Sequence, residues 1–197
     1  MKVDLLEVGP GFLVAGPHGA GRSTALATIA VGLRAAGWHV VAVTPRPSIV
    51  RNHANDAFDT HDPGLDDALV HLDGPLAVLV EDAELVTDSP VAGVLDRVMR
   101  TARDAGRIVV IAGSTDELAI GFRGFLVDAR RARSGILLNP RGSLDGEVLG
   151  VRLPRSTSGS APAGRGLLVV RGSITQLQVA LPASAHSAPS ATTAERP

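Results

Sequence analysis

The chain has 197 residues, of which 45% are hydrophobic, and this length suits one α/β domain with a sizeable core. The absence of Cys excludes disulfides, thiolate zinc sites and cysteine nucleophiles. The formal net charge is only −1, but residues 55–90 hold ten acids and no Lys or Arg, whereas residues 121–171 hold nine Arg. This asymmetry has three possible explanations: charged faces that are simply solvated, contact with a head-to-tail neighbour, or binding of nucleic acid.

Short apolar segments and turn residues alternate along the first part of the chain. The apolar start is interrupted by Gly9-Pro10-Gly11 and lacks a basic flank, so we expect neither a signal peptide nor a membrane span, and we assign the chain to the cytoplasm. Apolar residues at helical spacing follow. In order, the expected elements are strands at 3–7 and 12–15, a helix from about 22 to 37, a buried strand at 38–44, a mainly loop segment from 45 to 63 and a short helix at 65–72.

The second part of the chain continues this alternation, which predicts a mainly parallel sheet flanked by helices. Its last segments are predicted to form a small β extension that includes a hairpin. In order, the expected elements are a strand at 76–82, a helix at 91–102, a strand at 107–115, a helix at 117–133, and strands at 135–140, 146–154, 166–172 and 174–182. We therefore expect a domain over 1–182, and a disordered tail of small and polar residues over 183–197.

A glycine-rich segment, GPHGAGRST, lies between the second strand and the first long helix. It matches the phosphate-binding pattern of Gly, four residues, Gly-Lys-Ser/Thr, except that Arg22 stands at the lysine position. Such a loop directs backbone N–H groups and a helix N-terminus at phosphates, and its hydroxyl residue helps to hold Mg²⁺. The predicted nucleotide-binding residues are Gly16, Pro17, His18, Gly19, Ala20, Gly21, Arg22, Ser23 and Thr24, with Ser23 also a metal ligand.

Two acids, Glu81 and Asp82, follow the strand predicted at 76–82. An acid at this position holds the metal of a P-loop ATPase, and a second carboxylate activates the attacking water. We assign Glu81 to the metal and both acids to catalysis, although their order is the reverse of the common Asp-Glu. The alternative without a function is a strand end that carries solvated acids.

Ser114 follows the next strand and is a candidate sensor of the γ-phosphate. The candidates for an arginine that reaches the nucleotide of a neighbouring subunit are Arg123, Arg130, Arg131, Arg133 and Arg141.

Four segments together resemble the ATPase-type domain of the FtsK/SpoIIIE family, and most closely its actinobacterial branch with the EccC motors of type VII secretion. They are VDLLEVGPGFLVAGPHGAGRSTAL, LAVLVEDAELV, VVIAGSTDELAIGFRGFLVDARRARSGILLNP and LDGEVLGVRLPR. The resemblance implies a RecA-like P-loop fold, ATP and Mg²⁺ as cofactors, and assembly head-to-tail with other ATPase domains or subunits. It also implies DNA or a secreted protein as the translocated substrate, and membrane association only through other domains or subunits.

The two departures from the family pattern fall on groups that stabilise the transition state. We therefore expect an ATP-binding domain of a translocation assembly with weak or no hydrolysis. The alternatives are an active ATP-driven motor in which Arg22 replaces the lysine, and a structural interaction module without nucleotide. The chain is expected to be a domain of a longer protein or a short stand-alone relative.

Overall fold

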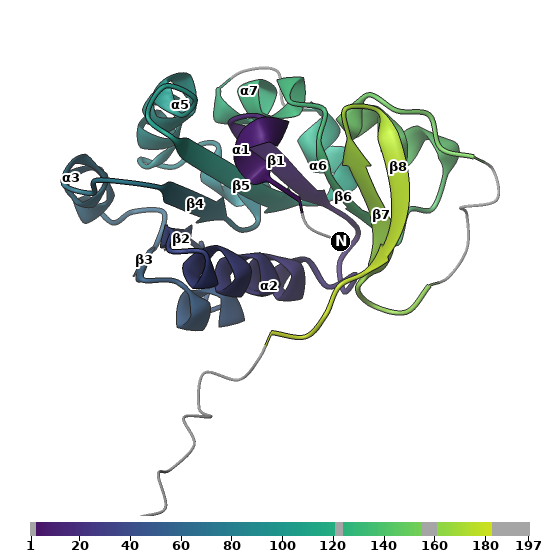
Figure 1. The fold of residues 1–197 in the computed structure, drawn as a ribbon, viewed down its shortest axis with the longest axis horizontal. Coiled ribbons are helices and arrows are strands. Elements are labelled where there is room, and N and C mark those ends of the chain that lie inside the picture. The colour runs from purple at the N-terminus through teal and green to yellow at the C-terminus, as the bar shows by residue number, and fades with distance from the viewer. Residues whose placement is uncertain (1–2, 121–123, 155–160, 183–197) are drawn as a thin grey trace, which may run out of the picture.

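An eight-stranded sheet runs through the computed structural model, which describes residues 3–120, 124–154 and 161–182 (Figure 1). The strand order is β3-β2-β4-β5-β1-β6-β7-β8. The strands from β3 to β6 pair in parallel, whereas β7 is antiparallel to β6 and forms a hairpin with β8. The strands are β1 Gly11–Ala15, β2 His39–Val43, β3 Asp56–Phe58, β4 Leu76–Val80, β5 Arg107–Gly113, β6 Gly135–Leu138, β7 Arg165–Val170 and β8 Ser173–Gln178.

Helices cover both faces of the sheet, and they bury two apolar clusters. One face carries α1 Leu5–Val8, α2 Arg22–Ala35 and the 3-10 helix η1 Ile49–His53. The other carries α3 Gly64–Val70, α4 Ala83–Val86, α5 Ala92–Thr101, α6 Thr115–Ile120, α7 Phe125–Arg131 and the 3-10 helix η2 Ser143–Leu149.

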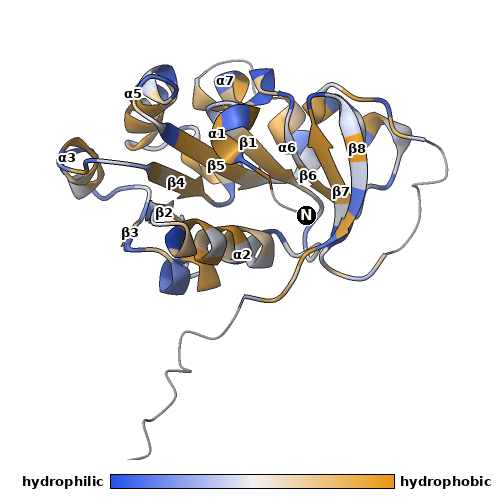
Figure 2. Cartoon of the chain, in the orientation of Figure 1, coloured by the Kyte–Doolittle hydropathy of each residue, from blue (hydrophilic) through white to orange (hydrophobic). Residues whose placement is uncertain are grey.

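The central strands are hydrophobic along nearly their whole length, apart from Arg107 at the start of β5 (Figure 2). In β4, Leu79 packs on the face of α2, whereas its neighbours Val78 and Val80 pack on the opposite face. A strand covered on both faces has no polar side, which is why its sequence is a continuous apolar run. None of the helices in the described part of the chain has the length and apolar character that a bilayer crossing requires.

The predicted α/β architecture is confirmed, including the mainly parallel sheet and the C-terminal hairpin. Two predictions in the first third are wrong. Residues predicted as a strand at 3–7 form the short helix α1, because Asp4 Oδ1 accepts a hydrogen bond from Leu6 N at 3.0 Å and caps its first turn. The segment predicted as a loop at 45–63 contains η1 and the edge strand β3, which pairs in parallel with β2.

Two further predictions, between residues 117 and 154, are wrong. The single helix expected at 117–133 is divided into α6 and α7, because Gly124 has φ +75° and Asp96 Oδ1 accepts a hydrogen bond from Phe125 N at 2.6 Å. The strand expected at 146–154 is replaced by η2, whose Val148 and Leu149 are both buried. The Asp145 carboxylate accepts a hydrogen bond from Arg141 N at 2.6 Å, and Gly150, with φ +68°, ends the turn, so the segment folds back locally instead of extending. The predicted tail, 183–197, lies outside the described residues.

Candidate functional site

Three parallel strands end side by side at one edge of the sheet, because β4, β5 and β1 are consecutive in its order. The glycine-rich loop follows β1, the two acids follow β4, and Ser114 follows β5. The topology therefore brings together the three segments that the sequence singled out. In an open parallel sheet, this carboxyl edge is where ligands bind.

The loop from Gly16 to Gly21 is a tight turn that requires glycine. Gly19 has φ +76° and Gly21 has φ +98°, a region that side chains other than glycine rarely adopt. At Gly16, a Cβ atom would lie 2.8 Å from the carbonyl oxygen of Leu138. The hydrogen bond from Ala20 N to Pro17 O, at 3.2 Å, closes the turn.

The start of α2 carries backbone donors that the helix does not use. Ala25 N donates to Gly21 O at 2.9 Å, whereas the N–H groups of Arg22, Ser23 and Thr24 precede the helical ladder, and no side chain of the described part caps them. Free amides at the positive end of a helix favour an anion. The loop and α2 therefore have the features of a phosphate-binding site.

A segment that the sequence did not indicate lies against the loop. Gly164 N donates a hydrogen bond to Ala20 O at 2.8 Å, and a Cβ atom on Gly21 would lie 3.1 Å from Gly164 N. The side chain of Asn139 holds the same segment from β6, since its Oδ1 accepts from Ala161 N at 3.3 Å. Residues 161–164 thus form a wall beside the loop. In the sequence, the only sign of this turn was Gly164 itself, which has φ +81° in the structure.

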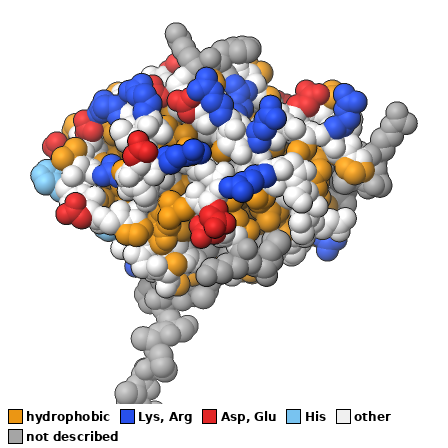
Figure 3. Space-filling view, turned by 45° about the horizontal axis from the view of Figure 1, so that its top comes forward, with side chains coloured by type: hydrophobic (Ala, Val, Ile, Leu, Met, Phe, Trp, Pro, Cys, Tyr) orange, Lys and Arg blue, Asp and Glu red, His pale blue; other side chains and the backbone are white. Residues whose placement is uncertain are grey.

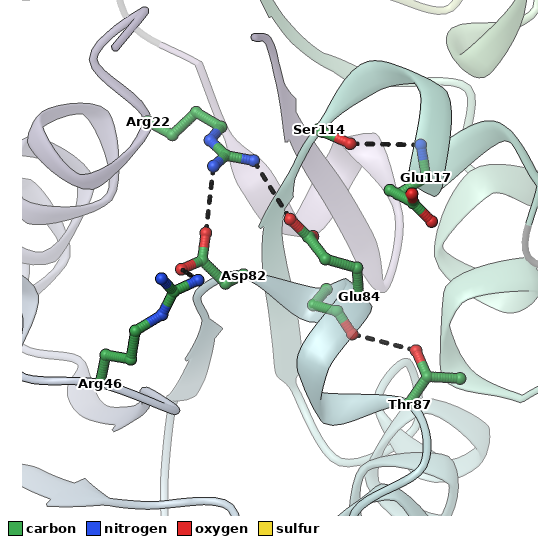
Figure 4. A network of polar contacts seen from close by, with 8 residues as sticks. Arg22, Arg46, Asp82, Glu84, Thr87, Ser114 and Glu117 are labelled. Carbon is green, nitrogen blue, oxygen red and sulfur yellow. Dashed lines mark hydrogen bonds and ion pairs between the residues drawn. The ribbon is translucent and has the colours of Figure 1, made fainter. Parts of the chain in front are cut away.

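Arg22, the residue at the lysine position of the motif, turns toward the acids that follow β4 (Figure 4). Its Nη2 lies 3.1 Å from Asp82 Oδ1, and its Nη1 lies 3.6 Å from Glu84 Oε1. The three side chains are 13%, 20% and 22% exposed, so these contacts are partly shielded from water. The guanidinium is thus held by two carboxylates.

Asp82 is shared by two arginines. Its Oδ2 accepts a hydrogen bond from Arg46 Nη2 at 3.0 Å, while its Oδ1 accepts from Arg22 (Figure 4). Arg46 follows β2 and is 66% exposed. Asp82 has φ +44°, and this left-handed conformation turns the chain from β4 into α4. We name Arg22, Arg46, Asp82 and Glu84 the arginine–carboxylate cluster. Glu84 and Arg46 were not among the site residues predicted from the sequence.

Hydrogen bonding within the arginine–carboxylate cluster is incomplete. Within the described part of the chain, Arg22 Nη1 and Glu84 Oε2 are buried atoms without a hydrogen-bond partner. Glu84 Oε2 packs against the end of β5, where a Cβ atom on Gly113 would lie 2.6 Å from it. A buried polar atom without a partner is costly, which marks the contact between Arg22 and Glu84 as one that a ligand can rearrange.

Glu81 is separated from this cluster by the direction of its side chain. It is 6% exposed, and its backbone N–H continues the sheet by donating to Val43 O at 3.0 Å. The alternation of β4 places it on the face of α2, as it does Leu79. No hydrogen bond or ion pair links its carboxylate to another residue that the structure describes. Glu81 and Asp82 thus lie in different environments rather than as a matched pair.

The remaining predicted site residues have ordinary local contacts. Ser114 Oγ accepts a hydrogen bond from Glu117 N at 3.3 Å and so caps α6. His18 is exposed in the loop. Among the candidate arginines, Arg131 pairs with Asp128 at 2.6 Å and Arg130 donates to Ala119 O, while Arg123 lies outside the described residues.

A basic surface lies at the opposite edge of the sheet from the glycine-rich loop. Figure 3 shows Lys and Arg side chains gathered over the part of the molecule that carries α5 and α7. A hollow of about 620 Å³ there includes Gly9 and Pro10, which precede β1, so it lies at the amino ends of the strands. Its basic lining residues are Arg100, Arg103, Arg131 and Arg171.

The fold is similar to that of solved type VII secretion ATPases, whereas no family model and no curated protein matches the sequence. EssC (ATPases 2 and 3) from Geobacillus thermodenitrificans matches 89% of this chain and 38% of its own, with a TM-score of 0.71 and 16% identity. The cytoplasmic domain of the Thermomonospora curvata type VII secretion ATPase EccC matches 91% of this chain and 24% of its own, with a TM-score of 0.65 and 22% identity.

A second Thermomonospora curvata structure, EccC (ATPases 2 and 3) in complex with a signal sequence peptide, gives a TM-score of 0.66 at 20% identity and covers 91% of this chain and 38% of that one. This chain therefore spans less than two fifths of the length of these three structures. The likeness confirms the predicted RecA-like P-loop fold, which the chain shares with these solved ATPase structures.

Proposed function

We propose that this chain is an ATP-binding domain of a type VII secretion or related FtsK/SpoIIIE-type translocation assembly, with weak or no hydrolysis of its own. The observation that carries the proposal is the position of Arg22, which begins the helix behind the phosphate loop and is held by Asp82 and Glu84. Binding and catalysis place different demands on this arrangement.

Binding is supported by the loop and the start of α2. Gly16, Gly19 and Gly21 allow the backbone to curve, and the first amides of α2 remain available as donors. Arg22 adds a positive charge at the same point, and a guanidinium suits phosphate oxygens. These features favour a di- or triphosphate, with ATP as the nucleotide implied by the family resemblance.

The proposal of weak hydrolysis is supported by the contacts of Asp82 and the burial of Glu81. A general base needs a free lone pair within reach of the water proton. Both oxygens of Asp82 instead accept hydrogen bonds from guanidiniums, so a water would have to compete with Arg22 and Arg46 for this carboxylate. Glu81 is buried on the other side of the strand end and carries one methylene more than the common Asp at that position.

The assembly is proposed from the fold and the charge distribution. The similar EssC and EccC structures contain ATPases 2 and 3 within one chain, and one of them is a complex with a signal sequence peptide. We propose that this domain likewise works beside other ATPase domains, in the cytoplasm, on a secreted protein or DNA. The acidic segment 55–90 and the arginine-lined hollow provide oppositely charged surfaces for a head-to-tail neighbour.

Thermal unfolding with and without ATP tests the proposal. At a concentration about a hundred times its dissociation constant, a ligand adds about 2.7 kcal/mol of stability, which raises the Tm of a chain of this size by about 5–10 °C. Arg22→Ala should reduce the shift, whereas Arg103→Ala, an exposed arginine remote from the loop, should keep it. No shift at saturating ATP would refute the proposal, and phosphate release measured in parallel would identify an active motor instead.

A further inference from the structure

The carboxylates beside the loop do not fit the divalent cation that ordinarily accompanies ATP. Mg²⁺ requires oxygen ligands at about 2.0–2.1 Å in nearly octahedral geometry. Both oxygens of Asp82 are already bonded to guanidiniums, and Glu84 Oε1 faces Arg22 at 3.6 Å.

We propose that Arg22 takes over the electrostatic role of the divalent cation, so that this site binds ATP as the metal-free anion. The inference rests on the proposed function, because it specifies the form in which that site takes its nucleotide. In an ordinary site the cation lies between phosphate and carboxylate and prevents their repulsion. Here the guanidinium of Arg22, the residue that directly follows the loop, extends to Asp82 and Glu84 beyond the end of β4 (Figure 4).

The charges of the arginine–carboxylate cluster support this role. Arg22 and Arg46 carry two positive charges, and Asp82 and Glu84 carry two negative charges, so the cluster is neutral without a metal. A phosphate that enters beside it meets no net negative charge from these acids. A Mg²⁺ ion that approached either oxygen of Asp82 would meet the guanidinium already bonded there, and it would have to lose part of its own firmly held water.

The shape of the guanidinium explains why arginine rather than lysine serves here. Arginine has five N–H donors in a planar fork, whereas lysine presents one compact charge. Arg22 uses Nη2 to hold Asp82, while its Nη1 has no hydrogen-bond partner among the described residues. One side chain can therefore hold the acid and still donate to a phosphate oxygen. A lysine that moved to the phosphate would leave the acid facing the anion.

The test is calorimetric titration of the full chain with ATP, once in EDTA and once in excess Mg²⁺. Wild-type protein should bind with dissociation constants that agree within about threefold, and titration of Mg²⁺ alone should give no binding heat. Arg22→Lys should bind at least about tenfold more weakly in EDTA than in Mg²⁺, a difference of about 1.4 kcal/mol. Adding Asp82→Asn to Arg22→Lys should abolish that difference, because the acid that needs the cation is then neutral.

The outcomes separate this inference from the proposed function. If the wild type binds ATP in Mg²⁺ and loses about tenfold or more in EDTA, the inference is refuted and the proposed function stands. If ATP binds in neither condition, the proposed function is refuted and the inference falls with it. Arg22→Lys that binds equally well in both conditions would also overturn the inference, since it would show that the guanidinium is not the group that replaces the metal.

Discussion

Replacement of Arg22 by Ala should destabilise the domain even in the absence of nucleotide. The guanidinium donates to Asp82 at 3.1 Å and lies 3.6 Å from Glu84, and it is 13% exposed. A hydrogen bond to a charged group contributes about 1.5–3 kcal/mol when buried, whereas an exposed ion pair contributes about 0.2–1 kcal/mol. Because Asp82 keeps Arg46 but Glu84 loses its ion-pair partner, we expect a loss of about 1–2 kcal/mol.

Urea unfolding without nucleotide measures this loss, and a double-mutant cycle identifies its source. The cycle compares Arg22→Ala, Glu84→Gln and the double variant, with an expected coupling free energy of about 0.5–1 kcal/mol. Arg103→Ala serves as the control, because this exposed arginine should change stability by less than about 0.5 kcal/mol. A variant Arg22→Ala as stable as the wild type would refute the reasoning, since it would mean that the acids do not hold the guanidinium before nucleotide arrives.

The packing of the site and of the core gives two further predictions, both measured by thermal unfolding. Gly16→Ala should lower the free energy of unfolding by about 1–3 kcal/mol, because its Cβ atom would lie 2.8 Å from Leu138 O. As a control, Gly32→Ala on the exposed side of α2 has open space and should raise the free energy of unfolding by up to about 1 kcal/mol. Equal effects of the two substitutions would contradict the close approach of the loop to β6. Leu95 is fully buried in α5, so Leu95→Ala should lower the free energy of unfolding by about 2–5 kcal/mol. Val70 is 70% exposed, so Val70→Ala should lower it by less than about 0.5 kcal/mol. Similar losses for the two variants would place Leu95 outside the core.

The central strands were predictable because their physical cause is local. Residues 76–80 and 108–112 are buried on both faces of the sheet, so burial selects an unbroken apolar run. The division between α6 and α7 was not predictable from periodicity, since the apolar spacing continues through it. The decisive contact is Asp96 of α5, which caps Phe125 N from 29 residues away. Such a cap depends on the packing of two helices and leaves no local pattern.

The candidate site was predictable in its location and not in its contacts. Strand ends after β1, β4 and β5 meet because the sheet is parallel, and the order of strand and helix in the sequence was sufficient to predict that. The bond between Arg22 and Asp82 depends on the left-handed backbone of Asp82, which the sequence did not indicate. Arg46 joins the cluster through the turn after β2, a segment whose structure was expected to be irregular.

The two departures from the motif form one arrangement. The long Arg22 reaches across to the short Asp82, and the left-handed turn at Asp82 is what presents its carboxylate to two guanidiniums. Reversing either departure alone should therefore not create a hydrolase. Arg22→Lys leaves the two acids in their reversed order, whereas exchange of Glu81 and Asp82 leaves an arginine at the lysine position. Only the triple variant, Arg22→Lys with Glu81→Asp and Asp82→Glu, restores the usual Lys and Asp-Glu pattern. We therefore expect measurable phosphate release from the triple variant alone. Phosphate release by Arg22→Lys would contradict this expectation, because it would show that the acids support hydrolysis in their present order.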